Sequence, residues 1–254
     1  MLAFNNGKNQ SNLRKDDILA CPLEKPALVA QKKLVEDLDE TFEKLNQAKA
    51  NLQKNLQNAK QLFESELNRI FSEKGEDWEE KRLGEICEIR NGKNQSEVLN
   101  PNGKYPIMGS GGNVMGYADK YICEEGTTII GRKGNISKPL YIEEKFWNVD
   151  TAFGIYPKNN IPTRYIYYIC LGINFVKMNR GTTIPSLVKS ELLQIPIFIP
   201  KSLKTQQTIV EKLDTLSAET KKLESIYKQK LVNLEELKKR ILADAFNGRR
   251  ESHT

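Results

Sequence analysis

Residues Ala30–Ser72, AQKKLVEDLDETFEKLNQAKANLQKNLQNAKQLFESELNRIFS, contain no glycine or proline, and this stretch decides the fold. Its apolar positions recur every seven residues in two interleaved sets, Leu38, Leu45, Leu52 and Ala59, and Phe42, Leu56, Phe63 and Ile70, with Lys49 as the exception in the second set. Such a pattern predicts a long helix with one narrow apolar stripe, which needs a partner helix. The stretch from Gln31 to Lys74 carries eight acidic and eight basic side chains, which is typical of a solvated face.

A second long helix is predicted from about Leu203 to Phe246. The first helix ends where a middle domain begins and the second starts where it ends, so a pair formed within one chain must be antiparallel. Each helix pairing with another chain is the alternative. For the intramolecular pair we expect an interface made of Leu38, Leu45, Leu52, Leu56 and Phe63 on the first helix and Leu213, Leu216, Leu223, Leu234, Leu237 and Ile241 on the second.

An internal repeat surrounds these helices. GKNQSNLRKDDILACPL at Gly7–Leu23 aligns with GTTIPSLVKSELLQIPI at Gly181–Ile197, and KLVEDLD at Lys33–Asp39 aligns with TIVEKLD at Thr208–Asp214 after a slip of one residue. The chain therefore reads as the end of one unit with its helix, followed by a nearly complete second unit with its own helix.

The middle stretch, Asp77–Pro200, is rich in glycine, proline, asparagine and aromatic residues. Its short β-prone runs, TTIIG (Thr127–Gly131), PLYI (Pro139–Ile142) and FGIYP (Phe153–Pro157), predict strands, and RYIYYICLGINF (Arg164–Phe175) is compatible with a helix. We therefore expect an α+β fold, in which one irregular α/β domain is flanked by two long helices that form an antiparallel coiled coil.

Composition bounds the class of protein. The net charge of +6 and the pI near 9.0 favour a polyanionic partner without proving one. No stretch approaches 18 apolar residues, and the N-terminal MLAFNNGKNQ lacks a signal-peptide pattern. Four cysteines (Cys21, Cys87, Cys123, Cys170) form no CxxC pair, which predicts reduced thiols in a cytoplasmic protein.

Residues for catalysis are missing from the sequence. The single histidine, His253, lies one residue from the C-terminus, and no metal-ligand cluster is evident. GSGGNVMG (Gly109–Gly116) does not fit GxGxxG and is interpreted as a turn, and EEK (Glu143–Lys145) lacks the Pro-Asp partner of a nuclease site. We expect no catalytic residue, metal or bound cofactor in this chain.

Polar loops of the middle domain are the candidate binding residues. From Thr151 to Ser190 there is no acidic residue but there are five basic ones, and the GRKGNISK loop is also free of acids. Arginine, asparagine and serine can contact base edges, and lysine can hold phosphates; a merely solvated basic loop is the alternative. The candidates are Arg132, Lys133, Asn135, Ser137 and Lys138; Arg180, Thr182 and Thr183; then Lys93, Asn94 and Gln95; and last Ser110 and Asn113.

Taken in order, several stretches resemble the DNA-specificity subunit of type I restriction-modification systems. They are DWEEKRLGEIC (Asp77–Cys87), YPIMGSGG with GYADKY (Tyr105–Tyr121), TTIIGRKGNIS (Thr127–Ser137), MNRGTTIPSLVKSELLQIPIFIP (Met178–Pro200) and TQQTIVEKLD (Thr205–Asp214). The resemblance implies a coiled coil that spaces two recognition domains, each reading half of a split site in double-stranded DNA. It also implies a subunit without catalysis, which recruits methyltransferase subunits and, through them, the restriction and translocase subunit. S-adenosylmethionine would belong to the methyltransferase partner.

The chain departs from that pattern because its first recognition domain is nearly missing. We expect residues 1–25 to be the remnant of that domain, 26–75 the first helix, 76–200 the recognition domain, 201–248 the second helix and 249–254 a disordered tail. Such a half-subunit would read a palindromic split site as a homodimer. NGKNQS, which occurs at Asn6–Ser11 and Asn91–Ser96, would mark a recombination seam.

Two other functions remain open from the sequence. A coiled-coil scaffold with non-specific DNA affinity would keep its function without the middle domain. A stand-alone nuclease or methyltransferase is disfavoured because the chain lacks a catalytic histidine and an Asn/Asp-Pro-Pro-Phe/Tyr motif.

Overall fold

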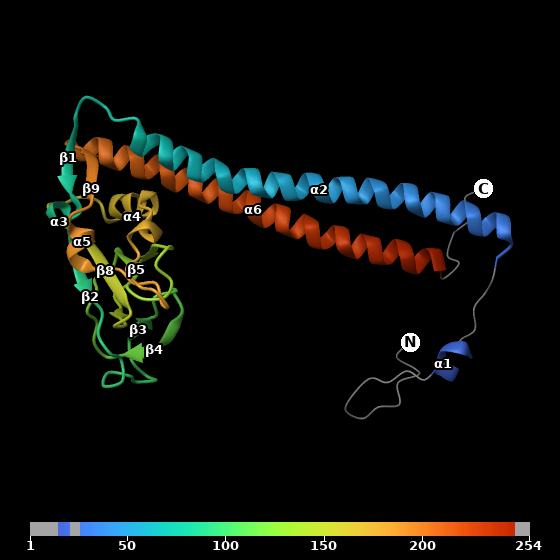
Figure 1. Cartoon of the computed structure of the whole chain (residues 1–254), viewed down its shortest axis with the longest axis horizontal. Coiled ribbons are helices and arrows are strands. Elements are labelled where there is room, and N and C mark those ends of the chain that lie inside the picture. The colour runs from blue at the N-terminus through green and yellow to red at the C-terminus, as the bar shows by residue number, and fades with distance from the viewer. Residues whose placement is uncertain (1–14, 21–25, 247–254) are drawn as a thin grey trace. The chain divides into compact units, whose positions relative to one another are not determined.

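The structure, a computed structural model, describes residues 15–20 and 26–246. The chain divides into two compact units, one of residues 1–54 and 229–254 and the other of residues 55–228. Two long helices, α2 (Leu28–Ser72) and α6 (Leu203–Phe246), contribute residues to both units (Figure 1). The first hexapeptide, Cys21, the C-terminal tail and most of the predicted remnant lie outside the described residues.

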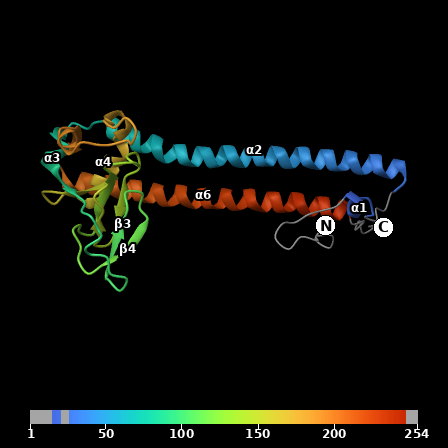
Figure 2. The same ribbon diagram turned by 60° about the horizontal axis from the view of Figure 1, so that its bottom comes forward.

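The two long helices are antiparallel partners within one chain. In the larger unit the Lys212 ammonium lies 2.6 Å from the Glu66 carboxylate, and in the smaller unit the Lys49 ammonium lies 2.5 Å from that of Glu235. The contact nearer the N-terminus of α2 is therefore the one nearer the C-terminus of α6, so the two helices run in opposite directions (Figure 2). This confirms the predicted intramolecular antiparallel pair.

The residues of the predicted seam differ in how far they are buried. Leu38, Leu45, Leu52, Leu56 and Phe63 are all half-buried, and on α6 Leu213 is fully buried while Leu216, Leu234 and Ile241 are half-buried.

Leu223 and Leu237, however, expose 38% and 46% of their surface. The half-buried positions at these turns are the following residues, Glu224 and Lys238. The Lys238 ammonium lies 5.2 Å from the ring centroid of Phe42 on α2. A long polar side chain can cover apolar surface with its aliphatic stem. At these two turns Glu224 and Lys238 therefore take the seam positions in place of the neighbouring leucines.

The residues that lie between the two long helices in the sequence form three small sheets. The two-stranded sheet pairs β1 (Trp78–Arg82) with β9 (Pro196–Pro200), and the three-stranded sheet has the order β4 (Val114–Ala118), β3 (Tyr105–Met108), β7 (Trp147–Asn148). The four-stranded sheet has the order β2 (Cys87–Asn91), β8 (Ala152–Pro157), β5 (Thr127–Gly131), β6 (Leu140–Ile142). Short helices complete the domain: α3 (Leu83–Ile86), α4 (Thr163–Gly172), the 3-10 turn Phe175–Met178 and α5 (Lys189–Leu193). The three predicted strands and the predicted helix are therefore present.

Strand β5, in the interior of the four-stranded sheet, is buried on both faces along its whole length. Ile130 belongs to the core that includes Tyr165 and Ile166 of α4, whereas Ile129 belongs to the core shared with Ile107 and Phe146. Successive strand residues point to opposite faces. The two cores therefore fix the sheet between α4 and the three-stranded sheet, and its loops can leave only at the strand ends.

Helix α4 ties this domain to the coiled coil. Arg164 donates from Nε and Nη2 to Oδ1 of Asp214 on α6, at 3.0 and 2.6 Å, and the Tyr168 hydroxyl donates to the same oxygen. Tyr168 also lies in a buried cluster with Leu67 of α2 and Leu213 of α6. The Asp214 carboxylate and this apolar cluster thus help to hold the middle domain against both helices.

The internal repeat is visible in the secondary structure. Lys15–Leu19 forms a short helix, α1, at the positions that align with α5, Lys189–Leu193. The two aligned stretches are both short helices, although Leu19 is exposed while Leu193, its counterpart in α5, is half-buried.

Candidate nucleic-acid interface

Two of the candidate loops leave the four-stranded sheet at the same end. Strand β8 lies between β2 and β5, with Asn91 opposite Phe153 and Gly131 opposite Ala152. Both neighbours run antiparallel to β8, so both end beside its first residues. The loop with Lys93 and the GRKGN loop therefore start side by side.

The short segment Asn148–Ala152, called the hub here, joins these loops by backbone hydrogen bonds. Its carbonyl groups accept from the amides of three loop residues: Lys93 to Asn148 at 2.8 Å, Gly92 to Ala152 at 3.0 Å, and Arg132 to Thr151 at 2.8 Å. These hydrogen bonds hold the backbone in place where each loop begins and leave the loop side chains free to project.

The RGTT loop joins the GRKGN loop directly. Lys133 and Ser186 form an isolated antiparallel bridge, the Gly134 amide donates to Pro185 at 2.9 Å, and the Leu187 amide donates to Arg132 at 2.9 Å. Leu187 is 4% exposed and anchors this contact in the core. Residues about fifty positions apart in the sequence thereby form one surface.

The glycine-rich turn adjoins the hub from the other side. Met108, the last residue of β3, pairs with Asn148, and the Val149 amide donates to its carbonyl at 3.3 Å. The turn follows at once and is closed by the Gly109 amide, which donates to Asn113 at 2.9 Å. The predicted turn is correct for Gly109–Asn113 and wrong beyond it, since β4 begins at Val114 because edge pairing with β3 extends the chain.

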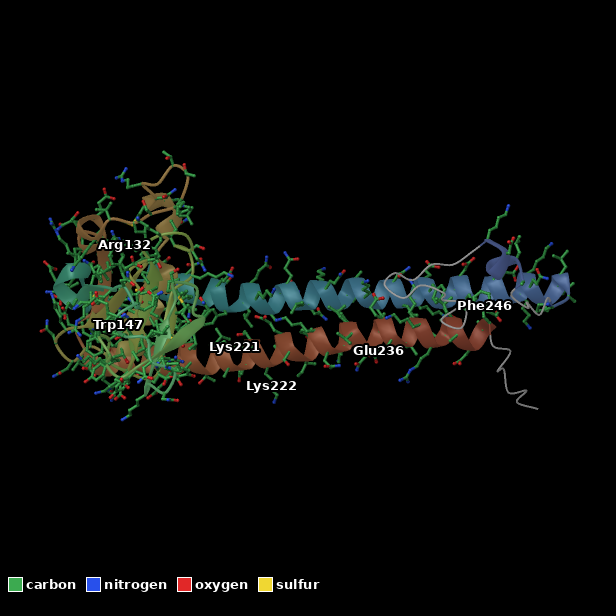
Figure 3. All side chains as sticks on the ribbon, turned by 90° about the horizontal axis from the view of Figure 1, so that it is seen from below. Arg132, Trp147, Lys221, Lys222, Glu236 and Phe246 are labelled. Atoms are coloured by element: carbon green, nitrogen blue, oxygen red, sulfur yellow. The ribbon has the colours of Figure 1, made fainter. Side chains whose placement is uncertain are left out.

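All four candidate loops therefore meet around the hub, and most of their predicted side chains reach the surface. The exposed ones are Lys93, Asn94, Asn113, Lys133, Asn135, Ser137, Lys138, Arg180, Thr182 and Thr183, and the half-buried ones are Gln95, Ser110 and Arg132. Figure 3 shows Arg132 and, nearby in the same domain, Trp147, whose indole donates to the Lys93 carbonyl at 3.1 Å.

The candidate side chains differ in how far other groups already engage them. Arg180 donates through Nε to both carboxylate oxygens of Glu191 at 3.1 Å, and Arg132 donates to the Asp150 carbonyl at 3.2 Å. Among the described residues, Lys133 and Lys138 form no side-chain hydrogen bond or ion pair. The two arginines are oriented by their partners, while the two lysines are exposed point charges without a partner among the described residues.

Glycine is required where these loops turn back on themselves. A Cβ on Gly131 would lie 1.9 Å from the Asn135 carbonyl oxygen, and one on Gly181 would lie 1.8 Å from that of Ile184. Any side chain at either position would push the backbone out of place. The loops are therefore shaped by close backbone approach, as the glycine-rich sequence predicts.

Sequence reasoning missed the residue that shapes the RGTT loop. Oδ1 of Asn179 accepts from the amides of Gly181 and Ser186, both at 2.8 Å, and its Nδ2 donates to the Gly181 carbonyl at 3.0 Å. Asparagine commonly bonds the backbone two residues on, so the Asn-Arg-Gly sequence was the available signal. The Ser186 contact, seven residues away, had no such signal.

Metal-ligating and nucleophilic side chains occur elsewhere in the part of the chain that the structure describes. Residues 15–20 and 26–246 contain no group of three or more histidine, cysteine, aspartate or glutamate side chains placed to hold a metal ion. Over the same residues, no helix is both long and apolar enough to span a bilayer. Cys87, Cys123 and Cys170 are buried free thiols, and burial raises the pKa of Cys87 and of Cys123 to about 12, which makes both poor nucleophiles.

Comparisons with known proteins agree with this geometry. Residues 75–233 match the family model described as the type I restriction modification DNA specificity domain. The chain is 27% identical, over 175 residues, to the type I restriction enzyme EcoDI specificity subunit of Escherichia coli, an alignment that covers 68% of this chain but 38% of that protein.

Two solved structures have the same fold. A chain from a structure of a type I restriction-modification system superposes with a TM-score of 0.82 at 17% identity, covering 94% of this chain and 65% of that one. The HsdS subunit from Thermoanaerobacter tengcongensis gives a TM-score of 0.64 at 17% identity, covering 96% and 64%. The family model spans more than half of the sequence, and this chain belongs to the type I restriction-modification DNA specificity family.

Proposed function

We propose that this chain recognises a specific sequence in double-stranded DNA and reads one half of a split site. The observation that carries the proposal is the meeting of four polar loops, three of which carry basic side chains, around the hub at one end of the four-stranded sheet. Adaptable side chains on loops that a rigid sheet holds in place are the arrangement that the reading of nucleotide bases needs.

The side chains of each loop indicate which part of the DNA it would contact. Arg132 and Arg180, each oriented by a partner, suit bidentate contact with guanine, whereas Asn94, Asn113 and Asn135 suit adenine. Lys133 and Lys138 suit phosphate oxygens, which gives affinity without sequence preference.

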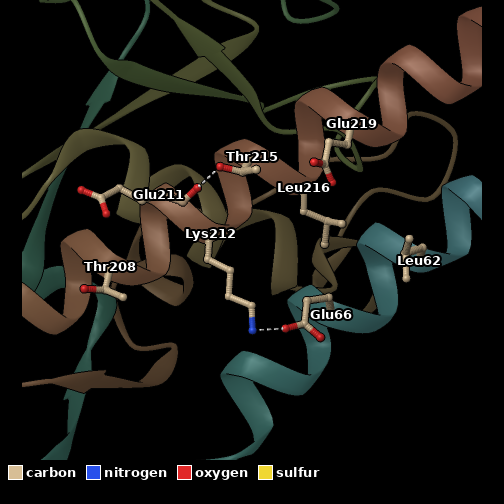
Figure 4. A pocket seen from close by; sticks show the side chains of 8 residues that line it. All are labelled: Leu62, Glu66, Thr208, Glu211, Lys212, Thr215, Leu216 and Glu219. Atoms are coloured by element: carbon tan, nitrogen blue, oxygen red, sulfur yellow. Dashed lines mark hydrogen bonds and ion pairs between the residues drawn. The ribbon is translucent and has the colours of Figure 1, made fainter.

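The long helices have the character of a protein-binding surface. A groove of about 550 Å³ lies between α2 and α6, lined by Leu62 and Leu216 and by Glu66, Thr208, Glu211, Lys212, Thr215 and Glu219 (Figure 4). We assign this surface to recruitment of the methyltransferase subunits, which would bring S-adenosylmethionine and the restriction and translocase subunit into the cytoplasmic complex. The aligned part of this chain covers 38% of the EcoDI subunit. We propose that two copies associate with two-fold symmetry and together read a palindromic site.

The test is selection from a random pool of double-stranded DNA, with and without the methyltransferase subunit. Enrichment of a split palindrome is expected and would support both sequence recognition and a two-copy assembly. Enrichment of a single short half-site would keep recognition and remove the homodimer. If no sequence is enriched although DNA binds, the scaffold alternative replaces this proposal.

A further inference from the structure

Strand β2 is an edge of the four-stranded sheet, and two connected grooves follow it. The first, of about 420 Å³, lies at the hub end of the strand and is lined by Glu88, Ile89, Arg90, Asn91, Lys93, Ile122 and Lys189. The second, of about 380 Å³, continues toward α3 and is lined by Arg82, Gly84, Glu85, Cys87, Glu88, Ile89, Lys158, Lys189, Leu193 and Gln194. Since both contain Glu88, Ile89 and Lys189, they form one track, called the β2 groove here. It starts at the candidate loop that carries Lys93.

The β2 groove has an excess of positive charge. Five basic and two acidic side chains line it. One of the two acids, Glu88, is already paired with Arg90 at 2.9 Å, and the other, Glu85, accepts from the Arg82 amide at 2.8 Å. Lys93, Lys158 and Lys189 form no ion pair with any described residue. Three ammonium groups therefore remain without a counter-charge.

The electrostatics of Glu88 report the same excess. Its pKa lies below the usual range, mainly because Arg90 donates to the carboxylate, and also because Lys189 and Lys158 lie close enough to act through space. The two lysines thus act on the same point of the groove from α5 and from the end of β8. One hydrogen of Lys158 goes to the Gly84 carbonyl at 2.7 Å, which orients the ammonium and leaves its other two hydrogens for a ligand.

We propose that the β2 groove binds the phosphate backbone of the DNA next to the bases that the loops read, with Lys93, Lys158 and Lys189 as the phosphate contacts. This inference rests on the proposed function, and it adds Lys158 and Lys189, which the candidate loops do not include. Lysine holds phosphate as a point charge and carries no sequence information, so the groove sets affinity and register rather than specificity.

Continuity with the loops is what favours DNA over a free anion. Lys93 begins the track beside the hub, and Lys189 lies three residues after Ser186, which bridges to the GRKGN loop. A DNA phosphate backbone that continues from the candidate loops on this side passes along the unpaired lysines before it reaches α3. A small anion would meet separate charges but no enclosed cradle.

The experiment measures the affinity of the full-length chain for its enriched DNA between 0.05 and 0.3 M salt, concentrations chosen as roughly the range where counterion release dominates. Each phosphate contact contributes about 0.9 to the slope of log affinity against log salt. Lys189→Gln should lower that slope by about 0.9 and weaken binding about five-fold near 0.15 M salt, with the enriched sequence unchanged. Lys158→Gln should act likewise, and Glu88→Gln should tighten binding because it frees Arg90.

Matched controls come from helix α6. Lys221 and Lys222 are exposed and line neither groove (Figure 3). Lys222→Gln removes the same charge and should leave the slope unchanged. The groove proposal is overturned if Lys189→Gln and Lys222→Gln give the same slope as wild type, even while wild type enriches a sequence. Failure of wild type to enrich any sequence counts against the proposed function instead, because the slopes remain measurable on unselected DNA.

Discussion

At the scale of single residues, identical side chains have different uses according to the groups around them. Arg164 belongs to the acid-free stretch of the sequence, yet it is bound to Asp214 and lies 4.5 Å from the ring of Tyr141. It holds the domain to the helices, although it lies in the same acid-free stretch as the candidate Arg180. Arg132, oriented by a backbone carbonyl at the hub, is one of the DNA-binding candidates.

Arg132 and Lys133 are neighbours whose substitution should separate base reading from phosphate binding. Arg132→Ala should relax one position of the enriched sequence by ~1–3 kcal/mol, because the bidentate donor is lost. Lys133→Ala should weaken all sequences alike and lower the salt slope by about 0.9. Selection followed by affinity measurement on single-base variants distinguishes the two, and a uniform loss with Arg132→Ala would exclude it from base reading.

Glu66 should give the coiled coil a pH dependence. Arg69 and, next in effect, Lys212 donate to its carboxylate and lower its pKa to about 2. The unfolded pKa is about 4.3. A lowered pKa in the folded state contributes stability that is complete above the unfolded value and is lost as the pH falls through about 2.

Thermal unfolding between pH 2 and 5, roughly the window set by those two pKa values, tests this. The melting temperature of wild type should fall more steeply than that of Glu66→Gln as the pH decreases. Glu64→Gln, at an exposed position of α2 without an ion pair to the described residues, is the control and should follow wild type. Parallel curves for wild type and Glu66→Gln would contradict the assignment.

At the scale of elements, burial rather than residue type decides which leucines hold α6 in place. Leu213 is fully buried and Leu223 is 38% exposed, although both belong to the stripe that the sequence predicts. Leu213→Ala should lower the free energy of unfolding by about 2–5 kcal/mol, because it removes apolar contacts and leaves a cavity beside Leu67 and Tyr168.

Leu223→Ala is the matched control for that substitution and should cost less than about 1 kcal/mol, since its side chain remains partly in water. Denaturant unfolding of both variants measures the difference. Equal losses would mean that the seam follows the leucines after all and that the α6 register described here is wrong.

At the scale of the whole molecule, the two compact units differ in how much they bury. Among the described residues, every side chain that is fully buried belongs to the unit of residues 55–228. The described part of the other unit consists of α1 and the distal halves of α2 and α6, whose seam residues are at most half-buried. Fewer buried apolar contacts mean a lower local free energy of opening.

Hydrogen exchange read by mass spectrometry should therefore divide each long helix in two. Amides of residues 28–54 and 229–246 should exchange faster than amides of residues 55–72 and 203–228 in the same helices. Uniform protection along α2 and α6 would contradict this division. The methyltransferase subunit, if it binds the groove between α2 and α6 as proposed, should slow exchange further at residues 62–66 and 208–219, and added protection elsewhere would locate its contact differently.

Much of this architecture was open to prediction because helix and strand periodicity are local. The glycine-free heptad stretch predicted α2, and the runs TTIIG, PLYI and FGIYP predicted β5, β6 and β8. Two of the candidate loops, GRKGN and RGTT, were proposed because they lie in acid-free segments, since charge is visible in order along the chain. The joint at Asp214, the exposed position of Leu223 and the β2 groove were not found, because each depends on residues far apart in the sequence.

The sequence by itself determined that two long helices flank one α+β domain along the chain. Heptad spacing requires a partner helix, and the two copies of the repeat predict a long helix after each. Only the tertiary structure decided which polar loops share a surface. Antiparallel pairing of β2 and β5 with β8 brings Lys93 and Arg132 to one end of the sheet, and the Lys133–Ser186 bridge adds the RGTT loop. Strand pairing over long separations depends on the packing of both sheet faces, and no local pattern records it.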